Sequence, residues 1–323
     1  MTSRAQAVAG GRVAVLAATL FATAATGADA PTSPAPDPEA TVVQELVVTA
    51  HAGGPAWWRV SSGVGTVYVL GVPEALPKGL KWDATLLRRR LAGARALIAP
   101  PVVTAGLGDF FALLNARKHF RSKGPMEATL PADLRARYLA DRAVLNPDPR
   151  AYSGWTPLVA ALLMVSDFRR HAGLEEREPA GAVARIARGQ NVRVVPAATY
   201  KAVPLIRAAE SGLTADGPPC LADALDEIEA GAGQVRTAAE GWARGDVAVA
   251  LSAQRGYEKC LHSLPEGADL AAKAMADTTA AITAALALPG HSVAVVNLRT
   301  LLARGGVLQT LQDRGFSVHK PNE

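Results

Sequence analysis

The sequence predicts an α/β fold, and three observations support this class. Runs rich in β-branched residues alternate with segments of helical period, and the order strand, helix, strand is clear between residues 57 and 103. Hydrophobic residues make up 49% of the chain, which is enough to bury a core and excludes a disordered or collagen-like chain. A length of 323 residues fits one large domain or two small ones, and one core is the simpler expectation.

The charge pattern argues against nucleic acid as a partner. The chain has 34 Lys and Arg residues against 29 Asp and Glu residues, a formal net charge of +5. The basic residues are scattered and form no long polybasic stripe. The run Arg88-Arg89-Arg90 fans out around a helix and is expected to be a solvated face.

Residues 1–30 have the pattern of a secretory signal peptide. Arg4 and Arg12 form a positively charged start, residues 13–25 are mostly apolar, and Ala28-Asp29-Ala30 is a small-residue cleavage site. The alternative is a membrane anchor, but the apolar stretch is shorter than the roughly 20 residues that a spanning helix needs. We therefore expect cleavage after Ala30 and a periplasmic or secreted protein without a transmembrane segment.

Residues 31–54 are expected to be a Pro-rich linker followed by an edge strand. Residues 31–40 (PTSPAPDPEA) bury too little apolar surface to offset the entropy of ordering them. Residues 41–50 (TVVQELVVTA) are β-branched and predict the strand. The main domain is then expected over residues 55–320.

The first elements of this domain are a β-hairpin, a helix and a strand. Residues 57–60 and 66–72 flank a short Gly-containing turn and predict the hairpin, in which Trp57 and Trp58 point to opposite faces, so one of them is expected to be exposed. Asp83 is the expected N-cap of a helix that runs to about residue 92. The remaining pattern predicts a buried strand at 96–103, helices at 106–120, 131–143, 155–168 and 180–188, a strand at 191–195, a helix at 268–288, a strand at 292–298, a helix at 306–314 and a strand at 316–319.

The clearest helical period lies between residues 221 and 242, where apolar residues recur at steps of three and four. Gly245 is expected to end this helix and Asp246 to cap the next one, which makes a helical hairpin. Cys220 and Cys260, in an oxidising compartment, predict one disulfide. A continuous return helix would leave the two sulfurs too far apart, so we expect the return arm to break near Gly256 and to continue extended.

Several short motifs, in this order, resemble the TraB/GumN family over about residues 55–318. They are Pro55 to Val60, Thr66 to Gly71, Leu80 to Trp82, Trp242 to Asp246, and the last strand, helix and strand from Ser292 to Val318. The resemblance implies a central sheet with a helical insertion, so we expect a central mixed β-sheet with flanking helices. It also implies a relation to the Tiki-type proteins, for which metal-dependent peptide hydrolysis is described.

The family's metal motifs are altered in this sequence. Members usually carry G-x-x-H at the end of the first hairpin and again at the end of the last long strand, an acidic residue on the strand between them, and a Glu after a middle strand. Imidazole and carboxylate groups at neighbouring strand ends can converge on one cation. The matching segments here are Gly71-Val72-Pro73-Glu74, Ala294 to Asn297 followed by Arg299, Ile98-Ala99-Pro100, and Val195 to Ala198.

These departures predict a degenerate member that keeps the scaffold and needs no cofactor. Asn offers a neutral oxygen in place of an imidazole, and Arg299 would repel a cation. If the two strand ends meet, Glu74 and Arg299 are expected to form a salt bridge in place of the metal. None of the six His residues, no Ser motif and no glycine-rich phosphate loop provides another catalytic signature.

Three functions fit this interpretation. The first is a non-catalytic exported protein that binds a peptide, glycan or protein partner at the ends of the central strands. The second is a hydrolase that uses Glu74 and another carboxylate, such as Asp83 or Asp277, as acid and base. The third is a structural component of the bacterial envelope held by the linker and the strand at 41–50.

Overall fold

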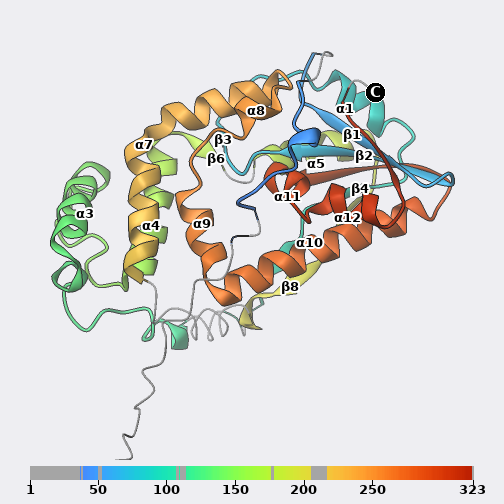
Figure 1. The fold of residues 1–323 in the computed structure, drawn as a ribbon. Coiled ribbons are helices and arrows are strands. Elements are labelled where there is room, and N and C mark those ends of the chain that lie inside the picture. Colours follow the sequence, from blue (N-terminus) through green and yellow to red (C-terminus); the bar gives the residue numbers. More distant parts are fainter. Residues whose placement is uncertain are drawn as a thin grey trace, which may run out of the picture. The chain divides into compact units, whose positions relative to one another are not determined.

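A six-stranded mixed sheet forms the centre of the fold in the computed structural model (Figure 1). The strand order is β10, β1, β2, β9, β4, β7, in which β2, β9, β4 and β7 run parallel and β1 is antiparallel to both of its neighbours. The central mixed sheet predicted for this chain is therefore confirmed. Its strands are β1 Trp57–Ser61, β2 Gly65–Val72, β4 Leu97–Ala99, β7 Val194–Pro196, β9 Gly290–Asn297 and β10 Ser317–His319.

The structure describes residues 37, 39–49, 53–106, 109, 114–175, 178–204 and 217–321. The expected signal peptide at 1–30 and most of the expected linker lie outside these residues, as do residues 107–108 and 110–113 of the helix expected at 106–120. Within the described part of the chain, no helix combines the length and the apolar character that crossing a membrane requires.

Helices cover the sheet, so the strands are buried on both faces. Helices α10 (Pro265–Leu286) and α11 (Leu298–Leu302) pack on β2 and β9, while α1 (Thr85–Leu91) and α5 (Glu178–Gly189) pack against β9 and β4 respectively. Helix α12 (Val307–Asp313) joins α11 to β10 and packs on α10. Strands that are buried on both faces consist of consecutive apolar residues, which explains why all residues from Val293 to Val296 are apolar.

Both Trp57 and Trp58 are buried, so the expectation that one would be exposed is wrong. Strand β1 is not an edge strand, because β10 pairs on its other side. The Arg90 guanidinium lies 4.6 Å from the centre of the Trp57 ring and covers that face. Arg59, two residues further along β1, is exposed, so the burial of Trp57 depends on local cover by Arg90.

A helical unit, the predicted insertion, packs around its own apolar cluster. Helices α3 (Ala132–Leu145), α4 (Pro157–His171) and α7 (Gly217–Ala243) bury Tyr138, Met164 and Leu225 among others. Helix α7 is kinked at Gly231, whose φ of 77° is in the left-handed region that glycine adopts without strain. The short elements of this part are η2 (Met126–Thr129) and the pair β3 (Leu76–Pro77) and β6 (Leu174–Glu175).

The predicted turn after α7 is confirmed, with Gly245 at a φ of 78° and Asp246 as the N-cap of α8 (Val247–Ala250). The Asp246 carboxylate accepts a hydrogen bond from the Val249 amide at 3.1 Å. Helix α9 (Gly256–Ser263) follows a break, as expected near Gly256, but the chain there is helical and the expected extended arm is wrong.

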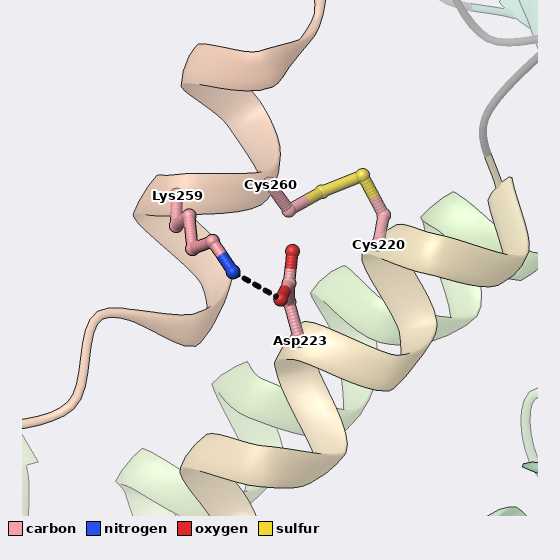
Figure 2. The surroundings of a disulfide bond; sticks show 4 residues. All are labelled: Cys220, Asp223, Lys259 and Cys260. Atoms are coloured by element: carbon pink, nitrogen blue, oxygen red, sulfur yellow. Dashed lines mark hydrogen bonds and ion pairs between the residues drawn. A yellow bond between two sulfur atoms is a disulfide. The ribbon is translucent and has the colours of Figure 1, made fainter. Parts of the chain in front are cut away.

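The predicted disulfide joins Cys220 on α7 to Cys260 on α9, with 4.8 Å between the Cα atoms (Figure 2). Gly256 makes this approach possible, because a Cβ there would lie 1.8 Å from the Asp223 carbonyl oxygen. An ion pair of 3.2 Å between Lys259 and Asp223 lies beside the bond (Figure 2). Helix α9 can therefore carry Cys260, because it begins at Gly256, where the chain contacts α7. It is not a continuous helix that runs back from the turn at Gly245.

The strand expected at 41–50 is wrong: residues Gln44–Leu46 form a 3-10 turn, η1, and Ala50 lies outside the described residues. The segment pairs instead through single bridges, Val42 with Ala303 and Thr49 with Asp246. The edge of the sheet beside β1 is already taken by β10, so the segment has no free strand to join on that side. Its apolar residue Leu46 is buried in the core.

The strand expected at 96–103 divides at Pro100-Pro101 into β4 and β5 (Val102–Thr104). Proline has no amide hydrogen for a sheet, so two prolines interrupt the pairing. Strand β5 pairs in parallel with β8 (Thr199–Lys201), which extends the β4 and β7 pair beyond the sheet. The other strands and helices predicted within the described residues are present.

Candidate functional site

The carboxyl ends of the parallel strands meet at one edge of the sheet. Val72 at the end of β2 lies opposite Asn297 at the end of β9, and Ala99 lies opposite Pro196 at the ends of β4 and β7. The crevice outside such strand ends is the usual ligand position in open α/β sheets. Glu74, Asn297 and Arg299 line one pocket here, so the structure brings the three predicted residues together.

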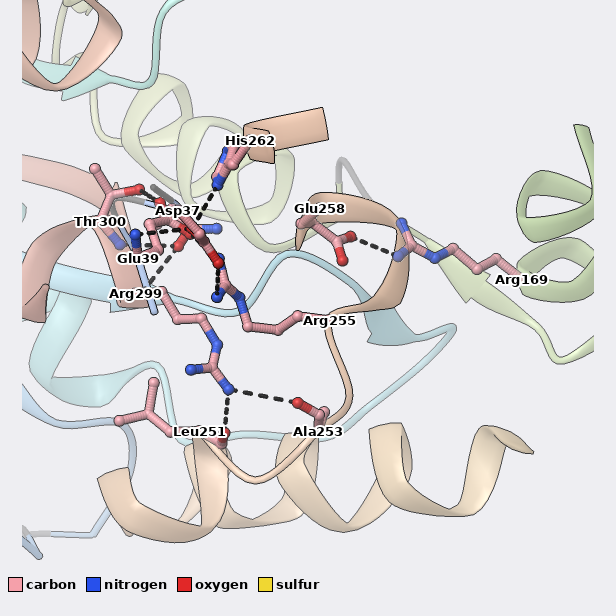
Figure 3. Close-up of polar contacts among 11 residues, drawn as sticks. Asp37, Glu39, Arg169, Leu251, Ala253, Arg255, Glu258, His262, Arg299 and Thr300 are labelled. Atoms are coloured by element: carbon pink, nitrogen blue, oxygen red, sulfur yellow. Dashed lines mark hydrogen bonds and ion pairs between the residues drawn. The ribbon is translucent and has the colours of Figure 1, made fainter. Parts of the chain in front are cut away.

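Glu74 lies beside a buried cluster that sequence analysis missed. Arg169 on α4 binds Glu227 on α7 through Nη2 at 2.7 Å and Glu258 on α9 through Nη2 at 2.6 Å (the latter in Figure 3). All three side chains are almost fully buried, with at most 10% of their surface exposed. One guanidinium therefore joins helices α4, α7 and α9 to one another, next to the strand ends.

A signal for this cluster is present in the sequence. Glu227 follows Ala224 by three residues and Cys220 by seven, so it lies on the helix face that carries the cysteine. A disulfide from that face to residue 260 places Glu227 toward α9. Arg169 has no comparable signal, because its helix joins the others only in the tertiary structure.

Glu74 and Glu258 are hydrogen bonded through their carboxyl groups, and their pKa values move in opposite directions. Burial by the surrounding protein raises the pKa of Glu74 well above its usual value, and the nearby Glu258 charge and the shared hydrogen bond raise it further. Burial would also raise the pKa of Glu258, but the Arg169 charge and hydrogen bond outweigh it and the pKa is lowered. These two directions favour the proton on Glu74 and the negative charge on Glu258.

The position of Glu74 gives this pair access to ligands. Its side chain is solvent-accessible although protein surrounds it, because it projects into the pocket. It also lines the larger groove described below. Because its proton is shared with Glu258, Glu74 can offer its remaining carboxyl oxygen as an acceptor to a ligand in either cavity.

Asn297 and Arg299 are engaged in other contacts. The Asn297 side-chain oxygen accepts from the Arg299 amide at 2.9 Å and from the Thr300 amide at 3.3 Å, which caps α11. The Arg299 guanidinium donates to the carbonyl oxygens of Leu251 and Ala253 (Figure 3). With Glu74 bonded to Glu258, the expected Glu74–Arg299 salt bridge is wrong.

The other candidate carboxylates lie outside this pocket. Asp83 is exposed and accepts from the Thr85 amide at 2.8 Å, but the N-cap residue of α1 is Ala84, so the expected N-cap at Asp83 is wrong by one residue. Asp277 on α10 binds Lys273 at 2.9 Å and the Tyr200 hydroxyl at 2.7 Å. Neither is among the residues that line the pocket with Glu74.

A larger and mostly apolar groove of about 820 Å³ opens beside Glu74. Strand β9 pairs with β4 only as far as Ala294 and Ile98, so the sheet splits beyond that point. The groove lies along the strand ends β2, β4 and β7 and against α5, with Glu74, Asn297 and Arg188 as its polar residues. Its volume is within the range of small-molecule and peptide pockets.

A sequence profile of the TraB/PrgY/gumN family matches residues 56–320. The chain belongs to this family. The resemblance found in the sequence is thereby confirmed, and no protein in the curated collections and no solved structure matches the chain. Two of the family-like segments contact each other, because the Trp242 indole donates a hydrogen bond of 2.7 Å to the Gly71 carbonyl.

The strand ends of this TraB/PrgY/gumN protein do not present the donor set of a divalent cation. Within the described ranges, no group of three or more His, Cys, Asp or Glu residues is placed to hold a metal ion. Beside Glu74, the Glu227 and Glu258 carboxylates already bind the Arg169 guanidinium, which supplies the positive charge between them. Asn297 uses its oxygen as a helix cap, and β4 and β7 end in Ala99 and Pro196.

Proposed function

We propose that the chain is an exported, non-catalytic member of the TraB/PrgY/gumN family that binds a partner at the carboxyl ends of its central strands. One observation carries this proposal: the groups at the expected ligand positions are bonded within the protein, while the groove beside them is open. The disulfide supports export, because such bonds persist mainly in oxidising compartments.

The lining of the groove favours a peptide with apolar side chains as the occupant. The walls consist largely of Val, Ala and Pro residues, which remove apolar side chains from water without competing for their hydrogen bonds. The Arg188 guanidinium offers hydrogen bonds to peptide carbonyl or carboxylate oxygens, and the Glu74 carboxyl group can accept from peptide amides. A scaffold role in the bacterial envelope is compatible with the same contacts.

Metal analysis tests the loss of the metal centre. Protein purified without added metal should contain far less than one equivalent of Zn²⁺, Mn²⁺, Co²⁺ or Fe²⁺ by mass spectrometry. One equivalent of tightly held divalent metal would overturn the proposal.

A paired substitution tests the groove. Val103 lines it and is 57% exposed, so Val103→Glu adds a charge without disturbing the core. Val144 on α3 is 83% exposed and lies outside the groove, so Val144→Glu is the matched control. On an array of apolar peptides, Val103→Glu should bind at least about ten-fold more weakly than the control. Equal peptide binding by the two variants would exclude the groove as the binding site.

A second candidate, a metal-independent hydrolase that uses Glu74, is favoured by the Glu74–Glu258 pair. Two carboxyl groups whose environments push their pKa values apart are the usual arrangement of an acid and a base. Glu258, rather than Asp83 or Asp277, would then act as the base toward water and Glu74 as the acid. Glu74→Gln should abolish turnover of a peptide library; absence of turnover by the wild-type protein would exclude this candidate.

A further inference from the structure

The segment Asp37–Glu39 places two carboxylates against a basic cluster formed by the last third of the chain (Figure 3). Asp37 binds Arg255 through both carboxylate oxygens, at 2.7 and 3.3 Å, and its Oδ1 is 3.2 Å from His262 Nδ1. Glu39 binds Arg255 at 3.1 Å and accepts from the Thr300 hydroxyl. All four carboxylate oxygens are thus contacted by side chains more than 200 residues away in sequence.

These contacts are separate from those that attach the segment to the domain. Residues 41–49 are held by backbone hydrogen bonds, including Val43 to Leu302 at 2.8 Å and Arg304 to Thr41 at 2.8 Å, and by the buried Leu46. The acidic part precedes this anchor. Its attachment depends mainly on the charged side chains, whereas the anchor depends on burial and backbone pairing.

The basic cluster is continuous with the pocket at the strand ends. Arg255 lines that pocket together with Arg299 and Glu74. The Asp37 and Glu39 charges also act on the Arg299 guanidinium, and the Glu39 charge acts on Glu74. Removal of the segment would leave Arg255 and Arg299 in the lining of the pocket, and His262, which also contacts Asp37, without these two opposing charges.

We infer that Arg255, His262 and Thr300 form a recognition site for an acidic peptide of the form Asp-x-Glu, which the chain's own Asp37 and Glu39 occupy as an intramolecular ligand. A planar guanidinium that binds one carboxylate through two nitrogens and a second carboxylate alongside selects both charge and spacing. The site lies apart from the apolar groove and does not require that groove to be occupied.

A peptide added in trans tests this inference on the full chain. The probe is an acetylated, labelled peptide of residues 35–41, and its control is the same peptide with Asn and Gln in place of Asp37 and Glu39. In the double variant Asp37→Asn, Glu39→Gln the site is freed, so the acidic probe should bind at least about ten-fold more tightly than to wild-type protein. The amide control peptide should not bind. Equal binding of the two peptides, or equal binding by variant and wild type, would overturn the inference.

A third substitution and an independent measurement complete the test. Adding Arg255→Met to the double variant should abolish binding of the acidic probe; retained binding would place the probe elsewhere. In wild-type protein, excess probe should speed hydrogen exchange at the Glu39 and Ala40 amides, because it displaces the chain's own segment. Unchanged exchange at saturating probe would contradict the inference even if the double variant did not fold. Val103→Glu should leave probe binding unchanged. The proposal for this site and the proposal for the groove can therefore be refuted independently of each other.

Discussion

Arg169 decides how two buried carboxylates, Glu227 and Glu258, are arranged beside Glu74 and the strand ends. Its guanidinium binds Glu227 and Glu258 directly, and its charge favours the ionised form of Glu258, which in turn favours the protonated form of Glu74. A buried ion pair adds little stability compared with apolar residues of the same size, but loss of one partner leaves an uncompensated charge. The cluster is therefore more important for the positions of its members than for stability.

Arg169→Met should lower the free energy of unfolding by about 3–5 kcal/mol, because two carboxylates stay buried without their cation. Urea denaturation followed by circular dichroism measures this change. Lys259→Met is the matched control, since Lys259 is 63% exposed in its ion pair with Asp223 and should cost less than about 1 kcal/mol. Replacing Glu227 and Glu258 by Gln in the Arg169→Met background should restore part of the loss. A cost for Arg169→Met no larger than that of the control would show that the network contributes little.

Glu74→Gln should change the pH dependence of stability. A carboxyl group whose pKa is raised on folding holds its proton more tightly in the folded state, so its contribution to stability is complete below the unfolded pKa of about 4.3 and is lost as the pH rises toward the folded pKa. Gln does not titrate. Relative to wild type, the variant should therefore gain stability as the pH rises above about 4.3.

The expected size of that gain is on the order of 1 kcal/mol, because the accessible side chain of Glu74 is partly screened by solvent. Denaturation curves at several pH values measure it. Parallel wild-type and variant profiles would show that the pKa of Glu74 is not displaced by folding.

At the scale of elements, α9 shows which features of a helix the local sequence pattern predicts and which it does not. The break before Gly256 was predicted from the distance between the two cysteines, and the disulfide confirms the reason for it. The helix after the break was not predicted, because its first residue is fixed by close contact with Asp223 on α7. Helix propensity alone does not show where such a contact permits a helix to begin.

Replacing Cys220 and Cys260 together by Ser should lower the free energy of unfolding by about 4 kcal/mol in the chain-entropy model for a separation of 40 residues. The measurement is urea denaturation of the double variant against the oxidised protein. The reduced wild-type protein should unfold close to the variant. A midpoint for the variant equal to that of the oxidised protein would show that α7 and α9 stay together without the bond.

At the scale of the whole molecule, residues 41–49 connect two distant parts of the fold. One is the end of α11, the helix that follows β9, and the other is the turn between α7 and α8. They pair with Ala303 on one side and with Asp246 on the other, and Leu46 enters the core. The segment thus joins the sheet to the helical unit. Its β-branched composition predicted a strand, but the partner that a strand needs was decided by the position of β10.

Removing residues 1–49 should lower the free energy of unfolding by about 2–4 kcal/mol, which is the expected cost of exposing the Leu46 site and breaking several backbone hydrogen bonds. A chain that starts at residue 41 is the control, because it keeps the anchor and lacks only the acidic part. In thermal denaturation, the chain without residues 1–49 should have a clearly lower melting temperature than the chain that starts at residue 41. Equal melting temperatures would show that the anchor contributes nothing to the fold.

The sequence by itself determined the family, the α/β class, the first hairpin, the cap at Asp246, and the cysteine pair. These features depend on local period, on turn residues and on motifs, which are written along the chain. Only the tertiary structure decided that Glu74 pairs with Glu258, that Arg299 binds a loop, and that Arg169 and Arg255 meet carboxylates from distant segments. The physical reason is that the pairing of charged side chains depends on which elements pack together, and several elements can present a charge of the same sign to the same strand ends.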